Sequence, residues 1–201
     1  MFDVLIIGGG VSGMSCSLVL GSAKNKPFVA DKKIGIFNHQ KTSSLQEALF
    51  NNAYGIPPGK LGSDLLHESI THLSETYPHI VQIPSEKVLK IEGICPEFTV
   101  ITNKTSYKTR IIVVGIGSAN TFAIEGLMEY VEPHQKSLPE KQRIQLKNSD
   151  HKVAEGIYVI GTLAGWRSQL AIAAGSGAAV ATDILTLWNG GIQTHAHDSI
   201  R

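Results

Sequence analysis

The chain has 201 residues, 42% of them hydrophobic and 17% charged, which favours one globular domain and excludes a disordered chain. The net charge is only +1, so nothing in the charge balance points to nucleic acid or an anionic membrane as a partner. Two distant cysteines, Cys16 and Cys95, form no CxxC pair, which argues against a dithiol site or zinc cluster and favours a cytoplasmic setting. The N-terminal apolar run, residues 4–7, is too short for a signal peptide or a membrane span.

The N-terminal segment predicts a strand, a helix and a second strand. Residues 2–7 form a short run that is apolar apart from Asp3, typical of a strand buried on both faces in a parallel sheet. A glycine-rich turn follows, and residues 12–20 then predict a helix that ends near Gly21. Residues 27–30 predict the second strand, which closes on Asp31. These elements make a βαβ unit, whose right-handed crossover places the two strands side by side.

The middle of the chain predicts an irregular excursion followed by a helix and several short strands. Residues 35–60 are rich in turn signals. Residues 63–76 predict an amphipathic helix that Ser63 can cap. Residues 111–114 predict another buried strand. Three segments between the helix and this strand predict shorter strands: residues 80–83, 87–92 and 98–102.

The last third of the chain is predicted to be mostly polar until a final strand and helix. Residues 119–152 have the weakest organisation, in part that of a linker, and the charged run within them predicts a solvated face. Residues 156–160 predict a strand and residues 161–187 a helix rich in small side chains. We expect one domain over residues 1–190, followed by a flexible tail over residues 191–201.

The glycine turn carries the clearest chemistry. In Gly8-x-Gly10-x-x-Gly13, the first glycine permits a tight turn, the second lets pyrophosphate approach the backbone, and the third lets helix and strand pack closely. The helix N-terminus offers N–H groups to the phosphates. Asp31, predicted at the end of the second strand, can accept hydrogen bonds from a ribose and repels a 2′-phosphate. The turn therefore predicts binding of the ADP half of a dinucleotide; the alternative is a turn without a ligand.

Other candidate residues have simpler interpretations. Cys16 lies close to the glycine turn, where a low-pKa thiol is conceivable, but a small buried core residue is favoured. The eight histidines show no ligand spacing on one element, so we predict no metal site.

The order of the segments resembles the thioredoxin-reductase-like flavoproteins, within the group of flavoproteins that have two dinucleotide-binding domains. The turn at Gly8–Gly13 and the start of the last helix, Arg167-Ser168-Gln169, are the most specific matches. The other matching stretches are residues 52–57 with 62–66, residues 98–118 and residues 156–161.

The resemblance implies an α/β Rossmann-type FAD-binding fold of three layers, with a parallel sheet and a small antiparallel β-meander near residues 80–107. It implies FAD as the cofactor. The implied contacts are Gly8, Gly10, Val11, Ser12 and Gly13 at the pyrophosphate; Asp31 and Lys32 at the adenosine ribose; Val88 near adenine; Gly115 and Gly117 on the adenosine-diphosphate side; Asn38 at the isoalloxazine; and Gly161, Thr162, Gln169 and Leu170 toward the ribityl chain and ring.

Two departures from the family pattern shape the expected function. Only 39 residues separate Gly117 from Ile157, where the family inserts a complete NADPH-binding domain carrying the redox CxxC. The relay from NADPH through flavin to a disulfide is therefore not expected. Thr162 also replaces the family's aspartate after Gly161, which implies a weaker contact to the ribityl chain.

The sequence therefore predicts a flavin-dependent oxidoreductase whose flavin is reduced directly by a diffusing substrate, a nicotinamide or a partner redox protein. No catalytic residue is identified. A homodimer is expected because a second subunit can cover the open flavin face, and Trp166 is either a flavin contact or an anchor for a partner chain. The alternatives are a non-enzymatic flavin- or nucleotide-binding sensor or electron-carrying subunit, and an interaction domain that has lost the cofactor.

Overall fold

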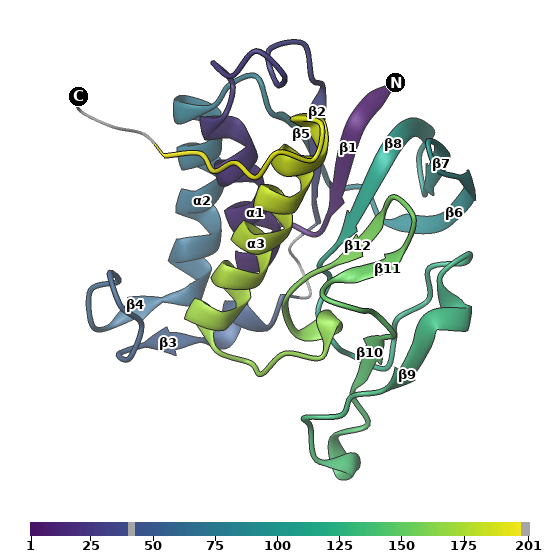
Figure 1. The fold of residues 1–201 in the computed structure, drawn as a ribbon. Coiled ribbons are helices and arrows are strands. Elements are labelled where there is room, and N and C mark those ends of the chain that lie inside the picture. Colours follow the sequence, from purple (N-terminus) through teal and green to yellow (C-terminus); the bar gives the residue numbers. More distant parts are fainter. Residues whose placement is uncertain (40–42, 198–201) are drawn as a thin grey trace.

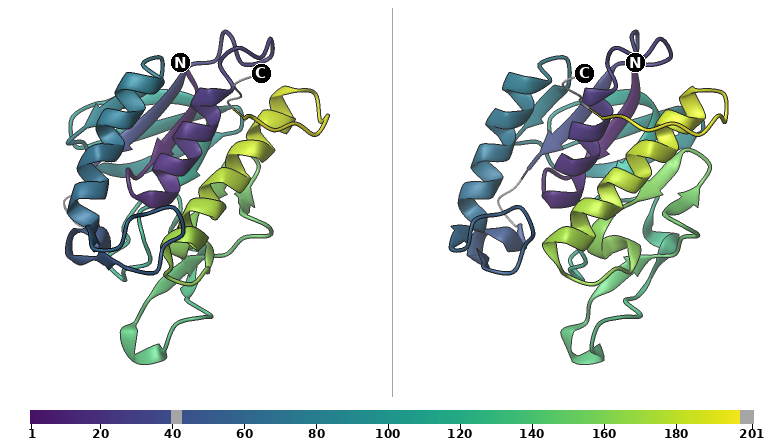
Figure 2. Two further views of the ribbon diagram at one scale, coloured as in Figure 1. Left: turned by 90° about the vertical axis from the view of Figure 1, so that its left-hand side faces the viewer. Right: turned by 60° about the vertical axis from the view of Figure 1, so that its left-hand side comes forward.

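A computed structural model describes residues 1–39 and 43–197 and has three layers (Figure 1). Helices α1 (Val11–Ser22), α2 (Gly62–Thr76) and α3 (Leu170–Trp188) cover one face of the central sheet, and the antiparallel strands β6 (Val88–Ile94) and β7 (Glu97–Thr102) lie across the other (Figure 2). This confirms the predicted three-layer α/β fold with a small meander.

The central sheet is parallel apart from one edge strand. Its strand order is β11-β12-β8-β1-β2-β5, with β7 pairing to β8 and β6 to β7. Strands β12, β8, β1, β2 and β5 are parallel, and β11 is antiparallel to β12. The bounds of these strands are β1 (Phe2–Ile7), β2 (Ile34–Asn38), β5 (Val81–Pro84), β8 (Ser106–Val114), β11 (Lys152–Ala154) and β12 (Ile157–Val159).

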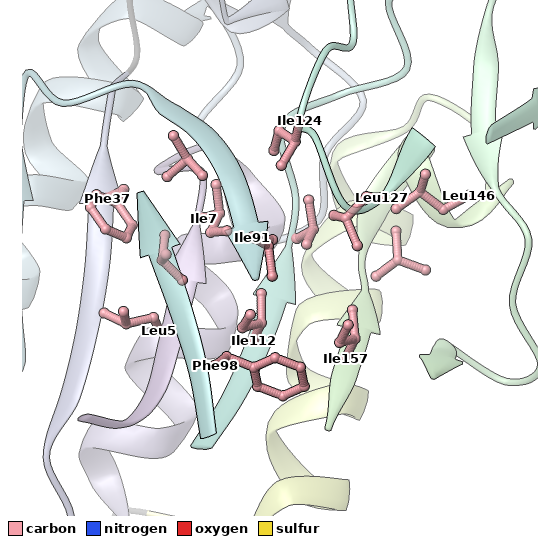
Figure 3. Packing of buried hydrophobic residues seen from close by; sticks show 14 of the residues in the cluster. Leu5, Ile7, Phe37, Ile91, Phe98, Ile112, Ile124, Leu127, Leu146 and Ile157 are labelled. Atoms are coloured by element: carbon pink, nitrogen blue, oxygen red, sulfur yellow. The ribbon is translucent and has the colours of Figure 1, made fainter. Parts of the chain in front are cut away.

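Strand β1 is buried on both faces, as its apolar run predicts. Val4 and Ile6 belong to the core beneath the helices, whereas Leu5 and Ile7 belong to the core beneath the meander. Successive side chains of a strand point to opposite faces, so a strand between two apolar layers needs an uninterrupted apolar sequence. The core beneath the meander also joins Phe98 of β7 to the sheet (Figure 3).

The position predicted for the second strand is wrong. Residues 26–32 form successive turns, with Val29 N–H donating to the Lys26 carbonyl (2.9 Å) and Lys32 N–H to the Val29 carbonyl (2.9 Å). The strand beside β1 is β2, and every residue of it is buried. Phe28 and Val29 are apolar because they pack under the helices, not because they are extended. Asp31 therefore precedes β2 instead of following it.

Several smaller predictions also change. The predicted helix at residues 63–76 is confirmed as α2, but its N-cap is Leu61 and Ser63 provides no cap. The segment at residues 80–83 is the parallel strand β5, so the meander consists of β6, β7 and β8. The last helix begins only at Leu170, after a short 3₁₀ turn, η4 (Gly161–Ala164).

Residues 119–152 are ordered, contrary to the prediction of a partial linker. They contain a two-stranded antiparallel hairpin of β9 (Val131–Pro133) and β10 (Ile144–Leu146). Leu127 and Leu146 are completely buried in the core beneath the meander (Figure 3). Phe122 and Ile124 are buried in the same core. This anchoring was not visible in the sequence because the apolar side chains that provide it are scattered among polar residues without a helix or strand period. The remaining short elements are β3 (Leu49–Phe50), β4 (Lys60–Leu61), η1 (Ser44–Glu47), η2 (Met128–Tyr130) and η3 (Pro139–Lys141).

Helix α3 is long and apolar enough to cross a membrane by length and composition alone. Buried helices of globular domains satisfy the same criterion, and α3 packs closely along α1. A Cβ on Gly177 would lie 1.9 Å from the Ser12 carbonyl oxygen, so the two backbones touch there. Gly177 of α3 thus serves the close contact with α1. Of the predicted tail, residues 198–201 lie outside the described residues.

Candidate functional site

The carboxyl ends of four parallel strands meet along one edge of the sheet. Ile7 of β1 is in register with Phe37 of β2 and Val114 of β8, and Val114 is in register with Val159 of β12. The chain leaves these strands at Gly8, Asn38, Gly115 and Ile160, so segments far apart in sequence come together. In open α/β sheets, ligands bind outside this edge.

The glycine turn has three glycines with three different surroundings. Gly8 has φ +117° and a Cβ there would lie 2.4 Å from the Gly115 carbonyl oxygen; a Cβ on Gly13 would lie 1.8 Å from the Gly8 carbonyl oxygen. Both positions therefore exclude side chains on internal grounds. Gly10, the N-cap of α1, has φ −78° and no atom within 4 Å of its Cβ direction. The fold itself therefore does not require a glycine at position 10. The absence of a side chain there leaves an open space beside the start of α1.

Ser12 is the point where the loops of this edge converge. Its hydroxyl oxygen lies 2.9 Å from the Cβ direction of Gly161 and 3.0 Å from that of Gly115. The N–H of Gly161 donates to the Ser176 hydroxyl of α3 (2.8 Å). The first turn of α1, the end of β8 and the start of η4 are therefore held against each other without intervening side chains.

Asn38 ends β2 and carries an unpartnered polar atom. Its side chain is 9% exposed, its amide NH₂ donates to Gln82 Oε1, and its own Oδ1 is buried without a hydrogen-bond partner in the described residues. Gln82 is held in turn by donating to the Ile70 carbonyl (3.0 Å). A buried carbonyl without a donor is costly, so Asn38 Oδ1 is suited to accept from a ligand.

Asp31 and Lys32 lie at the opposite edge of the sheet from the glycine turn, which corrects the site predicted for them. Asp3 N–H donates to the Lys33 carbonyl (2.8 Å), and Lys32 Nζ is 3.5 Å from Asp3 Oδ1. Five residues of strand separate this level from Gly8, about 16 Å at the usual rise. The position at the end of the second strand, where a ribose-binding side chain belongs, is held by Asn38.

The strand order also separates two residues predicted to share the flavin ring. Asn38 is the last residue of β2 and Gly161 follows β12, with β1 and β8 between these two strands. Three strand spacings correspond to about 14 Å, so the structure does not bring Asn38 together with Gly161. These two residues lie instead on either side of β1, which leads into the glycine turn.

The other predicted site residues are spread along the same edge. Val88 begins β6 and is buried in the core beneath the meander. Gly117 has φ +83° with open space around it. Thr162 is half-buried within η4, Gln169 is the exposed N-cap of α3, and Leu170 is half-buried behind it. The structure thus brings most of the set to the carboxyl edge, while Asp31 and Lys32 are far from it.

Cys16 is completely buried in the core beneath the helices, and burial raises the pKa of its thiol to about 12. This confirms the interpretation of Cys16 as a core residue, because a protonated thiol is a poor nucleophile. Within residues 1–39 and 43–197, no group of three His, Cys, Asp or Glu side chains is placed to hold a metal ion.

Sequence reasoning missed two cavities beside the β9–β10 hairpin. One, of about 460 Å³, lies within the hairpin and its connecting loop; the other, of about 210 Å³, lies between that loop and the residues leading into α3. The smaller cavity is lined by Lys141 and Arg143 from the run predicted to be a solvated face, together with Arg167. The clustering of basic residues near Trp166-Arg167 requires the tertiary fold, so only the basic character of each segment was visible in sequence.

Comparison with known proteins agrees with this geometry. Residues 2–176 match the family described as pyridine nucleotide-disulphide oxidoreductase. An uncharacterized oxidoreductase named CzcO from Bacillus velezensis is 25% identical over 171 residues, covering 80% of this chain and 48% of the relative. The chain therefore spans about half the length of this curated relative.

Solved structures share the fold at low identity. An oxidoreductase from Agrobacterium tumefaciens superposes with a TM-score of 0.72 at 14% identity, covering 92% of this chain and 98% of the other. A thioredoxin reductase from Gloeobacter violaceus superposes with a TM-score of 0.71 at 15% identity, covering 100% and 98%. With most of its length matched, the chain belongs to the pyridine nucleotide-disulphide oxidoreductase family and has the fold of its thioredoxin-reductase-like members.

Proposed function

We propose that the chain binds FAD along the carboxyl edge of its sheet and acts as a flavin-dependent oxidoreductase. The observation that carries this proposal is the open space next to Gly10, beside the first turn of α1. The first N–H groups of a helix have no partners within the helix, and with the positive end of the helix dipole they favour a pyrophosphate. A side chain at Gly10 would occupy the space that the pyrophosphate needs.

The residues on either side of the turn fit the two halves of an extended dinucleotide. Asn38 Oδ1 is buried and has no hydrogen-bond partner within the described part of the chain, so it can accept a hydrogen bond from a hydroxyl of the adenosine ribose. Toward β12, the open space at Gly117 and the short turn η4 lead to Gln169 and Leu170 at the start of α3. The flavin half is assigned to this side, where Gly117 leaves room for it.

Bound FAD supplies the electron-transfer chemistry, and the protein supplies binding, orientation and electrostatic tuning. Between β8 and β12 this chain has the β9–β10 hairpin, whose strands are three residues each. We therefore assign reduction of the flavin to direct encounter with a diffusing substrate, a nicotinamide or a partner redox protein. The homodimer expected from the sequence stays a prediction, which sedimentation of the purified chain measures.

Gly10→Val tests the proposal directly. The backbone at Gly10 is in an ordinary extended region and its Cβ direction is empty, so the melting temperature of the FAD-free protein is expected to stay within about 2 °C of wild type. FAD affinity is expected to fall at least 100-fold because the branched side chain fills the pyrophosphate space. Gly10→Ala is the matched control for added bulk and is expected to give a smaller loss.

The measurement is the flavin absorbance of purified protein and the Kd for added FAD. A wild-type protein that is colourless and takes up no FAD would refute the proposal. So would a Gly10→Val protein that binds FAD as tightly as wild type.

A further inference from the structure

We propose that the smaller cavity, of about 210 Å³, is a binding site for the phosphate group of a small molecule. It lies between the loop that joins β9 to β10 and the residues that precede α3. Figure 1 shows the β9–β10 hairpin at the lower right of the molecule. Phosphate binding there is independent of FAD. A role of this phosphate site in recognising the substrate that reacts with the flavin rests on the proposed function.

The charge of the cavity lining has one sign. Four cationic side chains line it, contributed by two segments distant in sequence, and no carboxylate is among its lining residues: Lys136, Lys141, Arg143 and Arg167. None of the four is ion-paired within the part of the chain that the structure describes. Cations held near one another without counter-charges repel, so a dianion bound among them relieves that repulsion.

His134 adds a buried donor. Its side chain is only 8% exposed and lines the cavity. Its Nδ1 accepts a hydrogen bond from the backbone N–H of Lys136 (3.1 Å), and this fixes the tautomer with the proton on Nε2. The other ring nitrogen then carries the proton, and in the proposed site it would donate to the bound phosphate.

The two walls of the cavity are fastened together. Gly165, in the loop before α3, lies so close to β10 that a Cβ there would be 2.6 Å from Gln145 Oε1. The same Gln145 oxygen accepts from the Gln135 N–H (3.0 Å), which fixes the loop between β9 and β10. A further bond runs from the Asn148 amide to the Ala164 carbonyl (3.3 Å). The cations are therefore presented by a preorganised frame, which lowers the cost of binding.

Trp166 gives the cavity an aromatic wall and an optical probe. Its ring stacks on His151 with centroids 5.5 Å apart, and Lys136 Nζ lies 5.6 Å from the ring centroid. A phosphate in the cavity competes with the indole for this lysine. Trp166 is also three residues from Gln169, which the proposed function places toward the flavin. The site thus lies where the anionic group of a flavin substrate would be held.

A phosphate is favoured over a carboxylate because four cations exceed what one monoanion needs. Arg forks and Lys point charges together are the usual phosphate donors. A single bidentate Arg suffices for a carboxylate, so acetate is expected to bind at least tenfold more weakly than inorganic phosphate.

The test is a titration of the purified protein with inorganic phosphate at constant ionic strength, followed by calorimetry and by the fluorescence of Trp166. The second tryptophan, Trp188, is removed by Trp188→Phe. Wild type is expected to saturate at one phosphate per chain. The double variant Lys141→Gln/Arg143→Gln is expected to bind at least tenfold more weakly, as is Arg167→Gln from the opposite wall. Lys147→Gln, an exposed neighbour that does not line the cavity, is the matched control and is expected to bind like wild type.

Phosphate that fails to saturate, equal affinity for acetate, or equal loss in Lys147→Gln would each overturn the proposal. Thermal unfolding of every variant identifies any that fails to fold, and Arg167→Gln keeps the test intact if the double variant does. The flavin content of the same samples is read separately by absorbance. A colourless protein that binds phosphate refutes only the proposed function, whereas a yellow protein that binds none refutes only this site.

Discussion

Two glycines of α3, two residues apart, are expected to respond to alanine in opposite ways. Gly177 faces α1, where a Cβ would lie 1.9 Å from the Ser12 carbonyl oxygen and 3.0 Å from the Cys16 nitrogen. Gly175 is exposed and a Cβ there meets no atom within 4 Å. Both changes replace a helix glycine by alanine, which raises the free energy of unfolding by up to about 1 kcal/mol through helix propensity. The difference in stability between the two variants therefore reports the contact between α3 and α1.

The magnitude follows from the overlap. A Cβ at 1.9 Å must move more than 1 Å to reach an ordinary contact, and its neighbours are backbone atoms that cannot rotate away. Separating two packed helices in this way costs about 2–3 kcal/mol net. For a chain of this length 1 kcal/mol shifts the melting temperature by about 2–4 °C. Gly177→Ala is thus expected to melt about 4–12 °C below wild type, and Gly175→Ala up to about 4 °C above it.

Thermal unfolding of the FAD-free proteins, followed by circular dichroism, measures both shifts. The FAD affinity of Gly177→Ala provides a second readout, because Ser12 belongs to the first turn of α1 and moves with it. If the two variants melt within about 1 °C of each other, the close approach of α1 and α3 is not as described here.

Two further predictions concern the edge of the sheet and the buried thiol. Asn38→Ala is expected to weaken FAD binding about 3- to 10-fold through loss of one hydrogen bond, whereas Asp31→Ala is expected to leave it within twofold; equal losses in the two titrations would restore Asp31 to the site. Because burial raises the pKa of Cys16 from 9.0 to about 12, its contribution to stability is complete below pH 9 and is lost as the pH rises toward 12, at about 1.4 kcal/mol per pH unit. Urea unfolding from pH 8 to 10.5 is expected to show this slope in wild type and not in Cys16→Ala; identical slopes would contradict it.

The parts of the fold that the sequence predicted correctly are those with a local cause. Strand β1, the glycine turn and α1 are encoded within about twenty consecutive residues. An apolar run specifies the strand, and three glycines with different structural roles specify the turn. The helix α2 is amphipathic and folds where its period predicts. The positions of Gly8 to Gly13 were predicted for the same reason, because the turn itself fixes them. Their contacts with a cofactor stay a prediction.

The errors arise where tertiary contacts decide the structure. The apolar pair Phe28 and Val29 is equally consistent with a strand and with a turn packed under helices, and only the fully buried strand at Ile34–Asn38 takes the place beside β1. Misplacing this strand moved the ribose-binding assignment to Asp31. A spacing rule counted from the glycine turn does not say which residues form the strand that pairs with β1 after the helix.

The residue at the end of β2 bears on whether the proposed site accepts a ribose with a free 2′-hydroxyl or one with a 2′-phosphate. An aspartate at the end of β2 would repel a 2′-phosphate, whereas Asn38 is neutral and offers both an acceptor and donors. If FAD binds as proposed, the buried end of β2 would select a ribose through hydrogen bonds rather than charge, since Asn38 Oδ1 has no partner among the residues that the structure describes and a ribose hydroxyl is a donor. If Asn38 Oδ1 pairs with the 2′-hydroxyl of that ribose, a fully ionised 2′-phosphate in its place offers no donor and leaves this buried oxygen unpaired, at a cost of about 1–3 kcal/mol. The proposed site would therefore still disfavour a 2′-phosphate, through a hydrogen bond of Asn38 and not through the charge of Asp31.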